Sequence, residues 1–285
     1  MVRFDWYEAT VRAPVGEVQA CLSDLAERGQ WEMLRKAPHG YGWASQLVDV
    51  DGPVARVWWG GMHQHPHAVV SGETAQGAAQ LLRTHLADHS VSRADPCIDY
   101  AEPGAYDRLQ AMAVDVAKER GVKIDTRGDH LATLKGRTVY LGATSSPARL
   151  RLYDKAAELR AQYALDPVRA ATVPEELARL ELQVRPHTPA AKRAAALAEP
   201  VELMGSAAWM RELMKRVADL DIEPFLAGKP WRQRDDDRAY AAMLAHYGGL
   251  ISRMAQVQGW ECLGLQIRDD LAERVEATKR RGMAP

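Results

Sequence analysis

Three short segments of the chain carry charged side chains at alternate positions, where a β-strand would present them on one face. In residues 93–99 that face holds Arg93, Asp95 and Asp99. The other two faces combine cations with a phenol or a carboxylate: Arg149, Arg151, Tyr153 and Lys155 in residues 149–155, and Arg179, Glu181, Gln183 and Arg185 in residues 179–185. The positions between them are mainly apolar, so each strand would turn its second face toward a core.

This combination of side chains suits phosphodiester chemistry. Carboxylates ligate hard divalent cations, arginines bind phosphate, and a phenol can act as a nucleophile. A tyrosine with a pKa of about 10 is a poor nucleophile at neutral pH, but neighbouring cations favour its phenolate, and a metal ion neutralises charge on the phosphate. For any single segment the competing interpretation is an antiparallel strand with one face in water, which requires no active site.

The charge distribution is consistent with a local nucleic-acid surface on a nearly neutral protein. The 285 residues carry 37 Lys+Arg and 38 Asp+Glu, a net charge of −1. Residues 127–193 contain 12 Lys+Arg and 7 Asp+Glu, so this segment is +5 and the remainder of the chain is −6. A basic patch of this kind is the electrostatic footprint expected of a DNA-binding enzyme, although charge runs are also common on solvated faces.

Other sequence features favour a cytoplasmic protein. Cys21, Cys97 and Cys262 are far apart and form no CxxC pair, so neither a disulfide framework nor a cysteine zinc site is indicated. The first residues are charged, and the sequence contains no uncharged apolar run of about 18 residues. We therefore expect no export signal, no membrane span and no membrane partner.

Hydrophobic periodicity predicts an α+β fold around antiparallel strands. The first series of expected elements is a strand over 4–12, a helix over 14–28, three strands within 38–71 and a helix over 74–88. A second series repeats this order: a strand over 91–100, a helix over 104–120, strands near 138–143 and 149–155, a short helix over 156–164, a linker around 166–174 and a strand over 178–185. The order suggests a duplicated βαβββα-like unit, with one polar catalytic face and helices on the other.

Beyond Pro186 the pattern becomes helical. Helical spacing occurs over 191–197, 201–220, 235–258 and 265–280. We expect this region to pack on the sheet or to form a dimer surface, which makes a homodimer one expected assembly.

The polar segments resemble the replication initiation factor family, the Rep_trans-type rolling-circle initiators of plasmids and filamentous phages with their related conjugative-element relaxases. The resemblance covers about residues 4–215 and is most specific in the tyrosine segment and the TxYxG block before it. The matching stretches, in the family's order and spacing, are SRADPCIDY (92–100), TVYLGATSS (138–146), RLRLYDKAAE (149–158) and RLELQVR (179–185).

This resemblance implies a role for each matching residue. Tyr153 would cut one DNA strand, remain joined to the 5′ phosphate and leave a free 3′ hydroxyl. The resemblance assigns no general base; from its position beside Tyr153, Lys155 could take the phenol's proton, as could a metal-bound water. Asp95, Asp99 and Glu181 would ligate Mg²⁺ or Mn²⁺, although Asp99 could equally orient Arg93. The implied phosphate contacts are Arg149, Arg151, Lys155, Arg179 and Arg185. Thr144 stands where the family commonly has an arginine, so that contact is either missing or supplied by Arg149.

The resemblance also implies partners, and the change of pattern after Pro186 predicts a domain division. The expected partners are single-stranded or supercoiled origin DNA and the host helicase and polymerase. The predicted division is a nicking domain over residues 1–187 and a helical region over 188–285. Two alternatives remain open: a conjugative relaxase with the same chemistry, and a sequence-specific DNA-binding protein that does not nick. The intact Tyr153, Asp95 and Glu181 argue against the second alternative.

Two aromatic features outside these segments are compatible with DNA binding. His63, His65 and His67 alternate, but Pro66 would disturb a regular strand. We expect a loop with DNA-facing or solvated histidines rather than a metal site. His67, at the start of the next strand, is expected to be a supporting active-site residue that contacts DNA. The pairs Trp6-Tyr7 and Trp58-Trp59 could stack on unpaired bases, although at least one ring of each pair should pack in the core.

Overall fold

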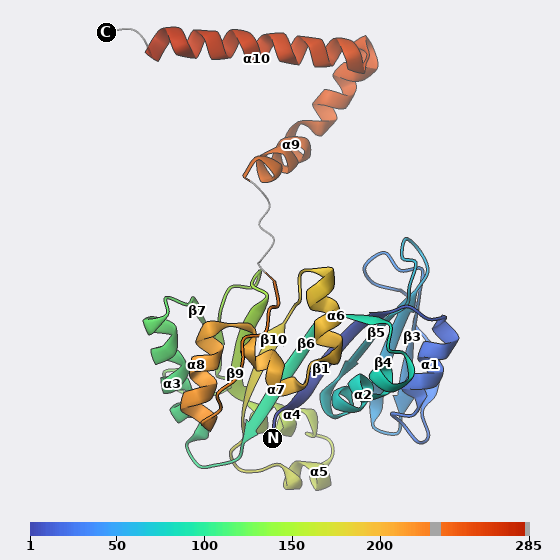
Figure 1. Ribbon diagram of the computed structural model, residues 1–285, viewed down its shortest axis with the longest axis vertical. Coiled ribbons are helices and arrows are strands. Elements are labelled where there is room, and N and C mark those ends of the chain that lie inside the picture. The colour runs from blue at the N-terminus through green and yellow to red at the C-terminus, as the bar shows by residue number, and fades with distance from the viewer. Residues whose placement is uncertain (229–234, 283–285) are drawn as a thin grey trace. The chain divides into compact units, whose positions relative to one another are not determined.

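The computed structural model describes residues 1–228 and 235–282, which form two compact units. The first unit, residues 1–230, contains an antiparallel sheet with helices (Figure 1). The second, residues 231–285, contains the helices α9 (Asp235–Gln258) and α10 (Trp260–Gly282). Within the described residues no helix combines the length and apolar character needed to cross a membrane.

The described part of the first unit forms one ten-stranded sheet in the order β2-β3-β4-β5-β1-β6-β10-β9-β8-β7. Every neighbouring pair is antiparallel, which confirms the predicted α+β class. The strands are β1 (Arg3–Val11), β2 (Gln30–Met33), β3 (Trp43–Asp49), β4 (Gly52–Trp59), β5 (His67–Ser71), β6 (His89–Tyr100), β7 (Ile124–Arg127), β8 (Thr138–Leu141), β9 (Ala148–Asp154) and β10 (Ala178–Val184).

The strand order is that of a duplicated unit whose halves meet at the centre of the sheet. The first strands of the two halves, β1 and β6, pair with each other. From β1 outward the order is β5, β4, β3 and β2, and from β6 outward it is β10, β9, β8 and β7. Each half has one more strand than the sequence pattern predicts. The additional strands, β2 and β7, are four residues long, lie at the two edges and are largely exposed, so they lack the alternating burial that marks a strand in a sequence.

Helices cover the apolar face of the sheet. They are α1 (Val15–Ser23), α2 (Ala75–His85), α3 (Ala105–Glu119), α6 (Pro189–Leu197), α7 (Pro200–Leu203) and α8 (Ala208–Ala218). Leu150, Leu152, Leu180 and Leu182 alternate with polar residues along β9 and β10, and they join a hydrophobic core with the buried faces of these helices. Because alternate strand residues point to opposite faces, this packing leaves the intervening polar residues on the other side of the sheet.

Two parts of the chain refine the expectations from sequence. The expected linker around 166–174 contains a short helix, α5 (Pro167–Thr172), whose N-terminus is capped by the Asp166 side chain. The helices α6 and α8, expected in a helical C-terminal region, pack on the sheet or on α3 within the first unit (Figure 1). The predicted functional division at residues 187 and 188 stays a prediction.

Candidate active site

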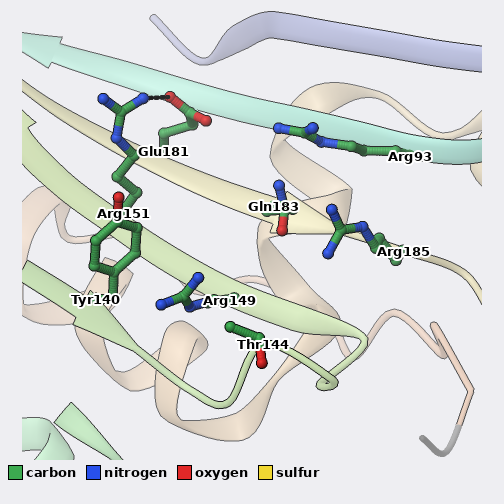
Figure 2. Close-up of a pocket in the computed structure, with 8 residues that line it drawn as sticks. All are labelled: Arg93, Tyr140, Thr144, Arg149, Arg151, Glu181, Gln183 and Arg185. Carbon is green, nitrogen blue, oxygen red and sulfur yellow. Dashed lines mark ion pairs between the residues drawn. The ribbon is translucent and has the colours of Figure 1, made fainter. Parts of the chain in front are cut away.

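The polar face of the second half of the sheet contains a cavity of about 450 Å³. Its walls come from β6, β8, β9 and β10, the turn between β8 and β9, and the residue after β10 (Figure 2). The lining residues are Arg93, Tyr140, Thr144, Arg149, Arg151, Glu181, Gln183 and Arg185. Four of the eight are arginines, so the cavity is suited to an anion such as a phosphate group.

Strand pairing brings these residues together. Arg151 on β9 is paired with Tyr140 on β8 and with Glu181 on β10. Side chains directly opposite each other on one face of an antiparallel pair have Cβ atoms about 5 Å apart, so the three form a row across the sheet. Gly142 allows the turn that follows β8: its φ is +94°, and a Cβ would lie 3.0 Å from the Ala148 carbonyl oxygen. The turn places Thr144 in the cavity wall.

Asp95 and Glu181 form a pair of buried carboxylates. Asp95 is fully buried, and the Arg93 Nε donates to both of its oxygens at 3.0 Å. Burial raises the pKa of both carboxyls, and the nearby Asp95 raises the pKa of Glu181 further. The Glu181 Oε2 atom accepts no hydrogen bond from the described residues and lies 3.9 Å from Nη1 of Arg151.

Asp99 lies in a different network, although it was predicted to share a metal with Asp95 and Glu181. Its Oδ1 accepts a hydrogen bond from Nε of Arg179 at 2.6 Å, and its Oδ2 accepts one from Arg3 at 2.7 Å. Burial acts to raise the pKa of Asp99, but these guanidinium hydrogen bonds outweigh it and lower the pKa. Arg179 also pairs with Asp5 at 2.5 Å. The partners of Asp99 are therefore Arg3 and Arg179, whereas Arg93 holds Asp95.

A metal site is consistent with Asp95 and Glu181. Two neighbouring buried carboxylates with raised pKa values and one oxygen without a hydrogen-bond partner form a donor set that a divalent cation would satisfy. Among the described residues there is no cluster of three or more His, Cys, Asp or Glu side chains placed to hold a metal. The three-carboxylate site stays a prediction, and the geometry brings together only its first and third members.

Tyr153 is 3% exposed and lies one row away from the cavity, between Thr138 on β8 and Arg179 on β10. The Arg151 guanidinium lies 3.7 Å from the centre of its ring, and the Lys155 ammonium lies 5.8 Å from it. The sequence led us to expect cations that lower the pKa of this phenol. Instead, burial and the carboxylates of Glu181 and Glu158 raise its pKa.

Burial of the phenol is the main cause of this difference, and the cations near Tyr153 are in addition paired with carboxylates. Lys155 forms an ion pair with Glu158, and Arg151 lies 3.5 Å from the same carboxylate and 3.9 Å from Glu181. The neighbouring carboxylates therefore partly cancel the effect of these positive charges on the pKa of the phenol.

Tyr140 is a functional candidate that the sequence-based site missed. Its side chain lines the cavity, its ring lies 4.1 Å from the Arg149 guanidinium carbon, and its hydroxyl points toward Arg151 (Figure 2). The signal was present in the sequence, because Tyr140 alternates with Val139 and Leu141 in the TVYLG stretch. Pairing with Arg151, which the sequence does not specify, is what gives Tyr140 its place in the site.

The predicted phosphate-binding residues separate into two groups. Arg149, Arg151 and Arg185 line the cavity, and the sequence-based site missed Arg93 beside them. Arg179 and Lys155 are not among the lining residues: Arg179 lies buried between Asp99 and Asp5, and Lys155 is paired with Glu158. Within residues 1–228 and 235–282 Arg185 forms no ion pair, and burial together with the neighbouring Arg93 lowers the pKa of its guanidinium. Crowded guanidinium groups of this kind are stabilised by a bound anion.

His67 lies in the first half of the sheet and is buried. Its ring nitrogens hydrogen-bond with Thr10 Oγ1 at 3.1 Å and with Glu8 Oε1 at 2.9 Å. His63 instead bonds to the carbonyl oxygen of His39 at 2.8 Å. In the described structure the His67 ring links Thr10 and Glu8 through hydrogen bonds. Its role in DNA binding stays a prediction.

Comparisons with known proteins give a distant structural likeness. No family model matches the sequence, and a search of curated proteins finds no match. Among solved structures, a rolling circle replication initiator protein from Geobacillus stearothermophilus matches 79% of this chain and 100% of its own, with 16% sequence identity and a TM-score of 0.49. At that distance the likeness assigns no function, so the proposal below is drawn from the side chains of the site.

Proposed function

We propose that the protein nicks and rejoins one strand of DNA through a tyrosine, as the initiator of rolling-circle replication of a plasmid or phage. The observation that carries the proposal is the composition of one cavity, in which four arginines surround a phenol and a carboxylate that has a buried carboxylate partner. The tyrosine and arginine segments that form it are also those that resemble replication initiation factors.

In this proposal the arginines hold the phosphates on either side of the cleaved bond. The phenol oxygen attacks phosphorus, the bond from phosphorus to the 3′ oxygen breaks, and the leaving 3′ oxygen acquires a proton. The strand then carries a free 3′ hydroxyl, while its 5′ phosphate stays joined to tyrosine. Attack by a 3′ hydroxyl on that phosphotyrosine reverses the step and joins two ends. Lys155 remains the proposed acceptor of the phenol's proton, a role that requires its ammonium, now paired with Glu158, first to lose a proton and become the neutral amine.

Asp95 and Glu181 would hold Mg²⁺ or Mn²⁺, which would neutralise charge on the phosphate in the transition state. Their burial excludes competing water from the carboxylates. The Arg93 hydrogen bonds orient Asp95, so Arg93 serves as a positioning residue as well as lining the cavity.

Two phenols compete for the role of nucleophile. Tyr153 belongs to the RLRLYDK segment and is our first candidate, and movement of the Arg151 side chain, which is 35% exposed, would uncover its ring. Tyr140 is favoured by its position in the cavity wall. Substitution of each tyrosine by phenylalanine removes only the hydroxyl and separates the candidates.

The proposal includes origin DNA, the host helicase and polymerase, and a homodimer as partners. A relaxase of a conjugative element would use the same chemistry on a transfer origin. The remaining alternative is a sequence-specific binder that does not cut.

The test incubates the protein, Tyr153→Phe and Tyr140→Phe with circular single-stranded DNA and with its own supercoiled replicon, in Mg²⁺, Mn²⁺ or EDTA. We expect a denaturation-resistant protein–DNA adduct that requires the metal and one of the two hydroxyls. An adduct in EDTA would contradict the metal assignment. Binding without any nick or adduct on either DNA would replace the nicking function with the binding alternative.

A further inference from the structure

A second cavity lies on the polar face of the first half of the sheet. It measures about 490 Å³, within the range of small-molecule pockets. The residues on which its chemistry depends are Trp6, Glu8, His39, Arg56, Trp58 and Val69. Arg93 and Arg185 line both this cavity and the candidate active site, so the two cavities are neighbours.

The second cavity offers aromatic surface. Trp6 and Trp58 are both partly exposed and line it. Arg93 lies 4.3 Å from the centre of the Trp6 ring, and the His67 ring stacks on Trp58 with centroids 5.4 Å apart. These contacts fix the orientation of both indoles. Val69, paired with Arg56 and Glu8 across the sheet, adds a small apolar side chain between charged neighbours.

The charges around the cavity favour an anion beside this aromatic surface. Arg56 and Arg185 form no ion pair within the described ranges 1–228 and 235–282, so both guanidiniums are able to donate hydrogen bonds to a phosphate. The Glu8 carboxylate is already engaged: it accepts hydrogen bonds from Trp6 Nε1 at 3.2 Å and from the His67 ring at 2.9 Å. A ligand with a flat ring and a phosphate matches both features.

We propose that this cavity binds one unpaired nucleotide of the DNA strand, adjacent to the phosphate that is cut. The base stacks on Trp58, and phosphates of the strand contact Arg56 and Arg185. The identity of the strand rests on the proposed function. A single strand is required because a base in a duplex has its faces covered by its neighbours. The shared arginines favour a polynucleotide that continues into the active site over a free nucleotide.

The test measures the affinity of a labelled single-stranded oligonucleotide in EDTA, while an abasic site is moved along it one position at a time. With the wild-type protein, we expect one position near the cleavage site at which loss of the base weakens binding by about 5- to 100-fold. In Trp58→Leu, the intact oligonucleotide should bind correspondingly more weakly. In this variant the abasic site should not weaken binding further, because the base no longer has the Trp58 indole on which to stack.

Trp43→Leu is the matched control. Trp43 is 60% exposed, lies in β3 and lines neither cavity, so its replacement should leave the abasic profile unchanged. Should Trp58→Leu fail to fold by circular dichroism, Arg56→Gln replaces it. Arg56 is exposed, and loss of its phosphate contact should reduce the slope of log affinity against log salt by about 1.

Three results would overturn the inference: a flat abasic profile, a weak position that persists in Trp58→Leu, or a thymidine monophosphate that competes as strongly as the oligonucleotide. The adduct assay separates this inference from the proposed function. An adduct with a flat abasic profile would remove the nucleotide site alone. An abasic profile with one weak position, together with no adduct, would contradict the nicking function and support the nucleotide site.

Discussion

The two halves of the sheet share one scaffold but differ in the side chains of their polar faces. Strand pairing defines two corresponding rows. In the second half, the first row contains Tyr153, Arg179 and Asp99 on β9, β10 and β6. The corresponding row of the first half contains Trp58, His67 and Thr10 on β4, β5 and β1. In the second half, the second row contains Tyr140, Arg151 and Glu181 on β8, β9 and β10. The corresponding row of the first half contains Gln46, Arg56 and Val69 on β3, β4 and β5.

The comparison separates what is common to both halves from what is particular to one. An arginine occupies the middle of the second row in each half, so anion binding belongs to both. The second half adds Glu181 and two phenols, whereas the first half has Val69, Gln46 and the Trp58 indole at the corresponding positions. The same backbone therefore supports phosphate chemistry in one half and a surface for a base in the other.

The largest expected effect comes from the carboxylate that distinguishes the halves. Glu181→Gln keeps the shape of the side chain but removes its charge, so nicking should fall by about 10²- to 10³-fold, measured as the single-turnover rate of adduct formation. Gln46→Leu, in the corresponding row of the first half, should leave the rate within about twofold. A Glu181→Gln protein that nicks at the wild-type rate would show that the carboxylate has no part in the reaction.

The next effect concerns stability. Arg179→Gln removes the guanidinium that Asp99 and Asp5 share and leaves Asp99 with Arg3 alone. We expect a loss of about 3 kcal/mol in the free energy of unfolding, measured by urea denaturation. The first-half counterpart, His67→Gln, breaks hydrogen bonds to Thr10 and Glu8 and should cost about 1 kcal/mol. Equal losses would mean that the ionic network contributes no more than the hydrogen-bonded one.

A smaller effect is expected where the two cavities meet. Arg185→Gln should weaken binding of single-stranded DNA and reduce the slope of log affinity against log salt by about 1, because one phosphate contact is lost. Arg108→Gln, on helix α3, is the control and should leave the slope unchanged. If Arg185→Gln binds with the wild-type slope, the strand does not pass over the arginines that the cavities share.

Much of the fold follows from local pattern in the sequence. The alternation of leucine with charged residues in 149–155 and 178–184 predicts both strands and the faces of their side chains, because a strand has a period of two. The edge strands β2 and β7 could not be found in this way, since they are four residues long and each places only one partly buried apolar side chain, Trp31 or Ile124, against the core.

The site is less fully predictable because its composition depends on strand register. Asp99 shares a face with Asp95 in the sequence pattern, yet its partners are Arg3 and Arg179, which lie 96 and 80 residues away. Pairing of β6 with β1 and β10 decides this, and no local pattern specifies it. The same holds for Tyr140, whose importance follows from pairing with Arg151.

The most direct test of the central claim is to identify the tyrosine that carries the DNA. Trypsin cleaves after Arg137, Arg149, Arg151 and Lys155, so it separates the Tyr140 peptide, residues 138–149, from the Tyr153 peptide, residues 152–155. After nuclease trimming of the adduct, mass spectrometry should locate a nucleotide 5′ phosphate on one of these two peptides, with residues 152–155 as our expectation. Attachment to any other residue, or no attachment under conditions in which DNA is cut, would contradict a tyrosine reaction at this site.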